Sequence, residues 1–258
     1  MRIISEIGLN HCGNELEAKY MVSKLLKSDV HGLTFQIKNK IFYNQVRQFY
    51  FHNNKTFLEN VREKNFYTNM KKKRQFISLE LNMKFYKNLI KNVKKRKKLI
   101  GFAIGDIEKL KLLSDSGADF FKILSEDFSN LNLINAAINS KAKIIYISTG
   151  LNSFKDIDNL LKKISKRKIV LIHTRFEKSI IKNQLEKIPV LQSLTRLPVA
   201  FSNHSSNYKI YDHLSKFNLS DVFFYVKNYK KRYYPDHSHA ISIQNINKHT
   251  KKLIKLYE

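Results

Sequence analysis

The sequence predicts an α/β protein of one domain, residues 1–258, whose parallel strands close into a (β/α)8 barrel. Three observations predict this fold. Short apolar runs rich in β-branched and aromatic residues recur along the chain. Most of these runs are nearly continuous rather than alternating, as in strands that are buried on both faces. Stretches with helical spacing separate them, so that one strand and one helix repeat about every 20–30 residues.

The apolar runs number eight, which is the number of strands that closes a (β/α)8 barrel. A chain of 258 residues also suits a barrel of this kind as a single unit. The candidate strands span residues 3–7, 32–37, 99–104, 120–124, 143–148, 169–173, 198–202 and 222–227.

The stretches between the strands carry apolar residues at helical spacing. In residues 153–165, for example, Phe154, Ile157 and Leu161 fall on one face. Ser153 followed by Asp156 resembles a capping box, with Asp in place of Glu. The other candidate helices are residues 16–27, 107–116, 130–139, 189–194 and 207–217, and residues 241–257 are predicted as the closing helix.

One connection is much longer than the others. Residues 38–98, called the excursion below, separate the second candidate strand from the third. Residues 43–67 are aromatic and polar without clear periodicity, whereas residues 85–95 predict a helix that runs into a lysine-rich end. The excursion is either a lid over the barrel mouth or a poorly ordered loop. We favour a lid, because loops at the C-terminal strand ends build the site in such barrels.

The chain is strongly basic, with 48 Lys and Arg against 21 Asp and Glu and a net charge of +27. Such a charge is typical of nucleic-acid-binding proteins. The lysines are spread along the chain, however, with local peaks at residues 71–74 and 94–98, and the chain is also rich in Asn, Ile and Tyr, as AT-rich genomes produce. We therefore favour solvated helix faces over a nucleic-acid surface. The positive field would still attract an anionic substrate.

The composition also bears on location. No apolar run is long enough to span a membrane, and the first residues do not read as a signal peptide. The single cysteine, Cys12, excludes an internal disulfide framework and fits a reducing compartment. We expect a soluble cytoplasmic protein with no membrane partner.

The first candidate strand ends in a polar cluster that is closed by Gly13. Alternation places Glu6 on the same face as Ile4, so this carboxylate has a partner, has a chemical task, or reaches solvent at the strand end. Nearly every other strand also ends in residues that suit anions, metals or sugars. These residues are Glu6, Asn10, His11, Gln36, Asp106, Lys122, Ser125, Asp127, Ser148, Thr149, His173, Thr174, Ser202, Asn203, His204, Lys227, Asn228, Asp236, His237 and His239.

Several short segments follow one another in a characteristic order. Residues 4–13 are similar to the motif AEIGxNHxG, and residues 121–131 to FKIxSxDxxNLxLI. Residues 148–150 match STG, and residues 188–204 resemble IPxL followed by LPVGxSDH. Residues 226–229 resemble a variant of EKHF, and residues 235–237 resemble PDH. Together these motifs span nearly the whole chain and resemble the sialic acid synthase family, including its legionaminic and pseudaminic acid synthase relatives.

This resemblance implies a barrel that condenses phosphoenolpyruvate with an N-acetylated amino sugar to form a nonulosonic acid for surface carbohydrate. It implies a divalent metal, Mn²⁺ or Mg²⁺, that polarises the sugar aldehyde or holds the attacking water. It also allows a homodimer. By position, the resemblance gives catalytic roles to Glu6 and Asp127, substrate-binding roles to Gln36, Lys122, Ser125, Ser148, Ser202 and Asp236, and the metal to His204, with Asn228 at the second ligand position.

The chain departs from the family pattern at several positions. Thr34 stands where the family has a lysine that pairs with the phosphoenolpyruvate anion, and Asn228 replaces the second metal-binding histidine, a role that His237 or His239 would have to take over. Residues 103–106 replace a serine-threonine-proline turn, and Phe176 and Lys178 replace a polar residue and a tyrosine. Because the chain ends at Glu258, we expect it to lack the antifreeze-like domain that follows the barrel in the family.

These departures leave two main hypotheses open. One is an active, divergent synthase that makes a surface sugar. The other is a catalytically weakened barrel that binds a sugar or a partner of the same pathway. The lost lysine and histidine favour the second hypothesis, and the retained polar residues favour the first. A basic nucleic-acid-binding protein is a third, less favoured hypothesis.

Overall fold

The computed structural model describes residues 1–52, 55–61, 63–150, 152–175, 185–206, 208–228 and 233–258. Eight parallel strands pair in chain order, and the first strand also pairs with the eighth, which closes the sheet into a barrel. The strands are β1 (Arg2–Gly8), β2 (Gly32–Ile37), β3 (Leu99–Ile104), β4 (Phe120–Ile123), β5 (Ile144–Ser148), β6 (Ile169–Arg175), β7 (Val199–Asn203) and β8 (Asp221–Lys227). The prediction of a (β/α)8 barrel is therefore confirmed.

Closure of the barrel pairs β1, near the start of the chain, with β8. Arg2 lies opposite Asp221 in the register of β1 and β8. The Arg2 guanidinium donates two hydrogen bonds to the Asp221 carboxylate, of 2.6 Å and 3.0 Å, and a third of 3.5 Å to the hydroxyl of Tyr146. Asp221 is completely buried, so its charge depends on this arginine.

Apolar side chains that point inwards fill the lower part of the barrel, which is the part of its interior near the N-terminal ends of the strands. Ile4, Phe120, Tyr146, Val170, Ile172, Ala200 and Phe223 form one buried cluster from six strands. The rings of Phe120, Tyr146 and Phe223 meet edge to face, with centroids 4.9–6.4 Å apart. Gly101 makes room for this cluster, because a Cβ atom at this position would overlap the Phe120 ring.

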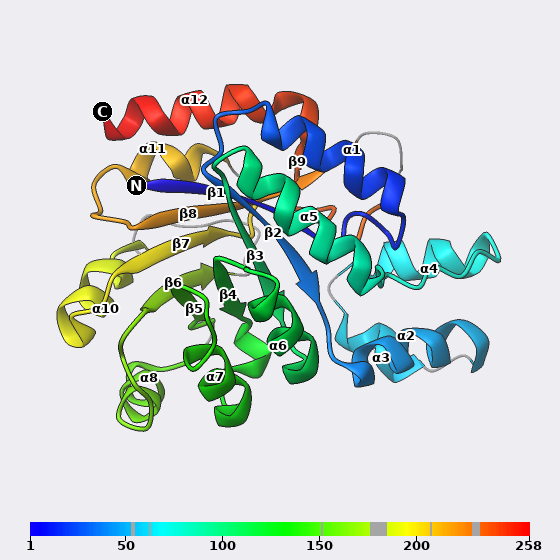
Figure 1. Ribbon diagram of the computed structural model, residues 1–258, viewed down its shortest axis with the longest axis horizontal. Helices are drawn as coiled ribbons and strands as arrows, with labels where there is room; N and C mark the ends of the chain where they lie inside the picture. Colours follow the sequence, from blue (N-terminus) through cyan, green and yellow to red (C-terminus); the bar gives the residue numbers. More distant parts are fainter. Residues whose placement is uncertain (53–54, 62, 151, 176–184, 207, 229–232) are drawn as a thin grey trace.

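A larger core separates the outer face of the barrel from the helices. The α1 and α12 helices lie at the top of Figure 1, and α6, α7 and α8 at the bottom. The predicted capping box of α8 is present, because Ser153 and Asp156 cap each other. The helices of this layer are α1 (Glu15–Leu26), α5 (Met83–Lys95), α6 (Ile107–Asp115), α7 (Leu131–Ile138), α8 (Phe154–Leu161), α10 (Lys187–Thr195), α11 (Tyr211–Leu214) and α12 (Ile246–Tyr257).

The excursion is helical for much of its length, although its sequence shows no clear period over residues 43–67. It forms α2 (Lys40–His52), α3 (Lys55–Asn60) and α4 (Lys64–Lys72) before α5 returns to the barrel. These helices project to the right in Figure 1, at the end of the barrel toward which β2 points. Their aromatic residues bury one another in a separate cluster, so helical periodicity relative to a single core is weak. This cluster is Leu9, Cys12, Val46, Phe49, Phe57, Phe66, Tyr67, Met70, Leu79 and Tyr234.

Two other predicted helices are wrong in their bounds. Residues 241–257 begin with a short strand, β9 (Ile241–Ser242), which pairs with β8, and a 3-10 turn, Ile243–Asn245, precedes α12. Residues 207–217 form only the 3-10 turn Tyr208–Ile210 and the single turn of α11, while residue 207 lies outside the described ranges. Contacts with the barrel determine which parts of these two segments are helical. The spacing of apolar residues along the sequence does not show those contacts. No helix in the described ranges has the length and apolar composition needed to cross a membrane.

The Arg2–Asp221 pair predicts a measurable stability difference. The variant Arg2→Met leaves a buried carboxylate without its cation, and we expect a loss of about 2–3 kcal/mol in the free energy of unfolding by urea. Lys141→Met is the control, because it breaks an exposed ion pair with Asp115 and should change stability by less than about 0.5 kcal/mol. Equal losses in the two variants would contradict the role assigned to Arg2.

Candidate functional site

A cavity of about 900 Å³ opens at the C-terminal ends of the strands. Its floor and one wall come from β2, β4, β5, β6 and β8, and the opposite wall comes from the excursion. The lining residues are Leu9, Gln36, Lys38, Phe42, Gln45, Thr56, Phe57, Asn60, Val61, Glu63, Tyr67, Lys122, Leu124, Ser125, Glu126, Ser148, Asn152, Asp156, Thr174, His204, Tyr225, Pro235 and Asp236. The excursion thus covers one side of the barrel mouth, as a lid would.

The polar floor of the cavity follows from strand alternation. Residues two apart on a strand share a face, so each inward apolar residue is followed, one step nearer the mouth, by another inward residue. In this way Phe120 is followed by Lys122, Tyr146 by Ser148 and Ile172 by Thr174. A polar layer therefore lies directly on the apolar cluster of the lower barrel.

Lys122 is the centre of this polar layer and is 1% exposed. Its ammonium donates to the Glu6 carboxylate and, at 3.4 Å, to the hydroxyl of Ser202. It also lies over the rings of Phe223 and Tyr225, at 5.0 Å and 5.9 Å from their centroids. Glu6 thus has a partner and does not reach solvent, and it holds the ammonium in place.

Ser202 links Lys122 to His204. The hydroxyl oxygen of Ser202 lies 3.1 Å from Nε2 of His204, which lines the cavity. The His204 ring stacks on the ring of His239, with centroids 4.9 Å apart, and meets Tyr225 edge to face. The end of β7 and the segment after β8 therefore meet at one corner of the site.

Three hydroxyl groups face the cavity without using their hydrogen-bonding capacity. They belong to Ser125 after β4, Ser148 at the end of β5 and Thr174 near the end of β6. The side-chain oxygens of all three are buried and have no hydrogen-bond partner within the described part of the chain. Because buried polar groups are normally paired, this row of donors is suited to an oxygen-rich ligand.

Asp236 is held at the cavity by the first strand. The side chain of the buried Asn10 accepts a hydrogen bond of 2.9 Å from the backbone N–H of Asp236 and donates one of 2.8 Å to the carbonyl of Val226. Gly8 ends β1 with φ near +55°, and a Cβ atom there would lie 2.9 Å from a carboxylate oxygen of Asp236. Asn10 and Gly8 together set the position of this carboxylate.

Asp127 lies in the 3-10 turn Ser125–Asp127 and does not line the cavity. Burial and, to a smaller extent, the charge of Glu126 raise the pKa of its carboxyl and the charge of Lys38 lowers it, so that the pKa is about 6. The carboxyl faces the backbone of Gly105, where a Cβ atom would lie 3.4 Å from its oxygen.

The structure thus brings together most, but not all, of the predicted site residues. Gln36, Lys122, Ser125, Ser148, His204 and Asp236 line the cavity. Glu6 and Ser202 lie below it and touch Lys122, whereas Asp127 and the buried Asn228 are not on its wall. Phe176 and Lys178 lie outside the described residues.

Some polar residues at strand ends have structural contacts instead. Asp106 caps α6 by accepting from the N–H of Lys109, and Nδ1 of His11 accepts from the N–H of Gly13. Other residues that line the cavity were not predicted from the sequence, notably Lys38, Glu126 and Tyr225. Period-two alternation from Gln36 to Lys38 and from Phe223 to Tyr225 is the signal that would have found two of them.

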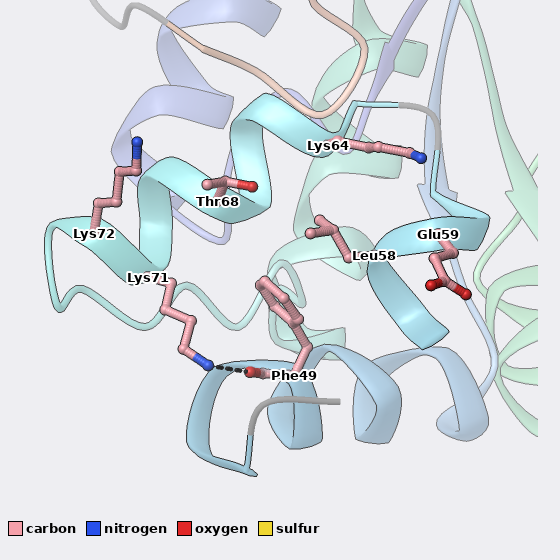
Figure 2. A pocket seen from close by; sticks show the side chains of 7 residues that line it. All are labelled: Phe49, Leu58, Glu59, Lys64, Thr68, Lys71 and Lys72. Atoms are coloured by element: carbon pink, nitrogen blue, oxygen red, sulfur yellow. Dashed lines mark hydrogen bonds between the residues drawn. The ribbon is translucent and has the colours of Figure 1, made fainter. Parts of the chain in front are cut away.

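A second cavity, of about 480 Å³, lies entirely within the excursion. Figure 2 shows Lys71 reaching from α4 to the backbone carbonyl of Phe49 on α2, a hydrogen bond of 3.1 Å. This cavity shares no lining residue with the barrel cavity. The barrel cavity, which contains the buried lysine and the three unpaired hydroxyls, is the candidate site.

The donor set does not fit a metal ion held by the protein alone. His204 presents an imidazole to the cavity, but within the described ranges no group of three or more His, Cys, Asp and Glu could hold a metal ion. Protein-built sites for transition metals commonly use three or four such ligands. The described residues of this cavity are therefore not sufficient by themselves to hold a transition metal.

The environment of Asp127 predicts a pH-dependent stability. Since its pKa is about 6 in the fold and 3.8 ordinarily, the folded chain binds this proton more tightly than the unfolded chain. Stability is therefore gained as the pH falls from about 6 to about 4. We expect Asp127→Asn to raise the melting temperature at pH 7.5 and to lose this advantage near pH 4.

Glu126→Gln is the companion variant, because it removes a charge that raises the pKa of Asp127. In that background the pH at which the advantage of Asp127→Asn disappears should move to a lower value. An advantage that is the same at pH 7.5 and pH 4 would show that Asp127 is not the titrating group.

The fold is similar to those of solved carbohydrate-pathway proteins. The N-acetylneuraminic acid synthetase of Leptospira borgpetersenii serovar Hardjo-bovis superimposes with a TM-score of 0.78 at 22% identity, over 99% of this chain and 83% of that one. The spore coat polysaccharide biosynthesis protein SpsE of Bacillus subtilis gives a TM-score of 0.72 at 16% identity, over 99% of this chain and 67% of that one. At these identities the likeness establishes the fold.

The sequence comparisons identify the family. The N,N'-diacetyllegionaminic acid synthase of Campylobacter jejuni subsp. jejuni serotype O:2 is 27% identical over 217 residues. The match covers 79% of this chain but only 60% of that enzyme. The model of the NeuB family matches residues 38–214, which is more than half of the chain. The chain therefore belongs to the NeuB family.

Proposed function

We propose that this protein condenses phosphoenolpyruvate with an N-acetylated amino sugar to form a nonulosonic acid for surface carbohydrate. One observation carries the proposal: the hydroxyls of Ser125, Ser148 and Thr174, which have no hydrogen-bond partner among the described residues, face the same cavity as the buried Lys122. This array suits the phosphate and carboxylate oxygens of a small anion. Membership in the NeuB family, and the likeness to a diacetyllegionaminic acid synthase, point to phosphoenolpyruvate as that anion.

In the proposed reaction, the CH2 carbon of phosphoenolpyruvate forms a bond to the aldehyde carbon of the sugar, whose C=O π bond breaks and whose oxygen takes up a proton. Water adds to the carbon that carries the phosphate and gives up its protons, the bond between that carbon and the phosphate oxygen breaks, and inorganic phosphate leaves as that carbon becomes a ketone. Lys122 and the hydroxyls would bind the anion and orient it. Gln36 and Asp236, on the cavity wall, would face the sugar.

Catalytic roles for Glu6 and Asp127 remain predictions, because neither carboxylate lines the cavity. In this proposal Glu6 acts through Lys122, whose ammonium it holds. A divalent cation, Mn²⁺ or Mg²⁺, belongs to the proposal only as an ion that substrate oxygens would help to bind beside His204. The cytoplasm is part of the same proposal, because the single cysteine, Cys12, fits a reducing compartment, and a homodimer remains a prediction.

The proposal is tested by phosphate release from phosphoenolpyruvate in the presence of Mn²⁺ and a panel of N-acetylated hexosamines. We expect release with at least one sugar, and a fall of about tenfold in kcat/KM for Ser148→Ala, which removes one donor to the anion. Ser129→Ala, an exposed position outside the cavity, is the matched control and should leave kcat/KM unchanged. No release with any sugar and no heat of phosphoenolpyruvate binding would overturn the proposal. Binding without release would favour the catalytically weakened barrel.

The donor set also predicts weak metal binding by the free protein. In calorimetric titrations with Mn²⁺ and no substrate, we expect wild type and His204→Ala to bind equally weakly. Saturable binding by wild type that is lost in His204→Ala would show that this histidine belongs to a protein-built metal site after all.

A further inference from the structure

The inner face of β2 carries its cation nearer the mouth than the family motif would place it. Thr34, Gln36 and Lys38 are two residues apart and share this face. Thr34 lies opposite Glu6 in the register of β1 and β2, is buried, and donates to the carbonyl of Phe35. Lys38 follows directly after β2 and lines the cavity. The charge is therefore displaced by about 13 Å along the strand.

Local contacts hold Lys38 toward the cavity. Its backbone N–H donates to the hydroxyl of Tyr43 at 3.2 Å, and its ammonium lies 5.0 Å from the centre of the Phe42 ring. The ammonium donates to the carboxylate of Glu126 at 2.5 Å. The Lys38 side chain is 14% exposed and that of Glu126 is 57% exposed, so Glu126 can turn into water while Lys38 stays.

Among the described residues, the cavity wall carries two lysines and the carboxylates of Glu63, Glu126, Asp156 and Asp236, so an entering anion depends on the lysines. Among the described lining residues, the lysines are Lys38 and Lys122. Lys122 is paired below the cavity with the buried Glu6, whose charge it neutralises. An entering anion therefore meets one ammonium whose partner is buried and fixed, and one whose partner is a solvated carboxylate.

We propose that Lys38 binds the phosphoryl group of the substrate together with the hydroxyl of Ser125, and that Glu126 occupies Lys38 when the substrate is absent. Ser125 directly precedes Glu126, whose carboxylate accepts from the ammonium of Lys38, and Ser125 and Lys38 line the same cavity. The Ser125 hydroxyl has no hydrogen-bond partner among the described residues, so it is available to the same anion. This assignment rests on the proposed function in naming the substrate, and it makes Lys38 a binding residue that compensates for Thr34.

Binding of inorganic phosphate and of phosphoenolpyruvate, measured by calorimetry at low salt, tests the proposal. We expect Lys38→Gln to weaken both by about tenfold or more, and Lys38→Arg to retain most of the affinity. Lys40→Gln is the matched control: it removes the same charge two residues away, at an exposed position outside the cavity that pairs with Glu108. It should leave both affinities within about twofold of wild type.

Glu126→Gln provides a test that loss of structure cannot mimic. Because Glu126 competes with the phosphoryl group for Lys38, its neutralisation should tighten phosphate binding severalfold. The same change in the Lys38→Gln background should have little effect. If Glu126→Gln tightens phosphate binding equally in the wild-type and Lys38→Gln backgrounds, Glu126 only repels the anion in general. That result would overturn the proposal that the phosphoryl group replaces Glu126 as the partner of Lys38.

These measurements separate the inference from the proposed function. If wild type releases phosphate with a sugar but Lys38→Gln binds and reacts like wild type, the role of Lys38 is wrong and the proposed function stands. If wild type releases none but binds phosphate in a Lys38-dependent way, the role of Lys38 stands and the proposed function falls. No binding of either anion by wild type would overturn the role of Lys38.

Discussion

Closure of the sheet between β1 and β8 is the constraint on which the rest of the structure depends. It places the Arg2 guanidinium against the buried Asp221 at one end and leaves no sheet edge within the barrel. Closure also limits the interior to what inward side chains can fill. The rings of Phe120, Tyr146 and Phe223 take up the lower interior, and Gly101 is needed because a side chain there would overlap Phe120.

The position of the polar layer follows from the aromatic rings that fill the barrel interior beneath it. Because the next inward residue on each strand lies beyond the aromatic floor, Lys122, Ser148 and Thr174 all line the cavity. Burial of Lys122 would be costly without compensation, and Glu6 provides the opposite charge from across the barrel. Stability and the candidate site are thus linked, since the carboxylate that makes the buried lysine tolerable is also the one that orients it.

The excursion completes the site from outside the barrel. Its helices have their own aromatic core, which includes Leu9 from the loop after β1 and Tyr234 from the segment after β8. The wall that they form is therefore anchored to the same loops that carry Asn10 and Asp236. Lys38 stands at the junction, directly after β2 and before α2, where the barrel floor and this wall meet.

The fold class, six of the eight candidate helices and six of the residues that line the cavity follow from the sequence alone, because buried parallel strands leave continuous apolar runs and end in conspicuous polar residues. It also identified Thr34 and Asn228 as departures. The pairing of Glu6 with Lys122, the lack of partners for the three hydroxyls within the described residues, and the exclusion of Asp127 from the cavity wall depend on the tertiary structure. Each depends on contacts between strands that are distant in the chain. Helices α2, α3 and α4 of the excursion were not predicted from the sequence, because their apolar residues face one another and not the barrel.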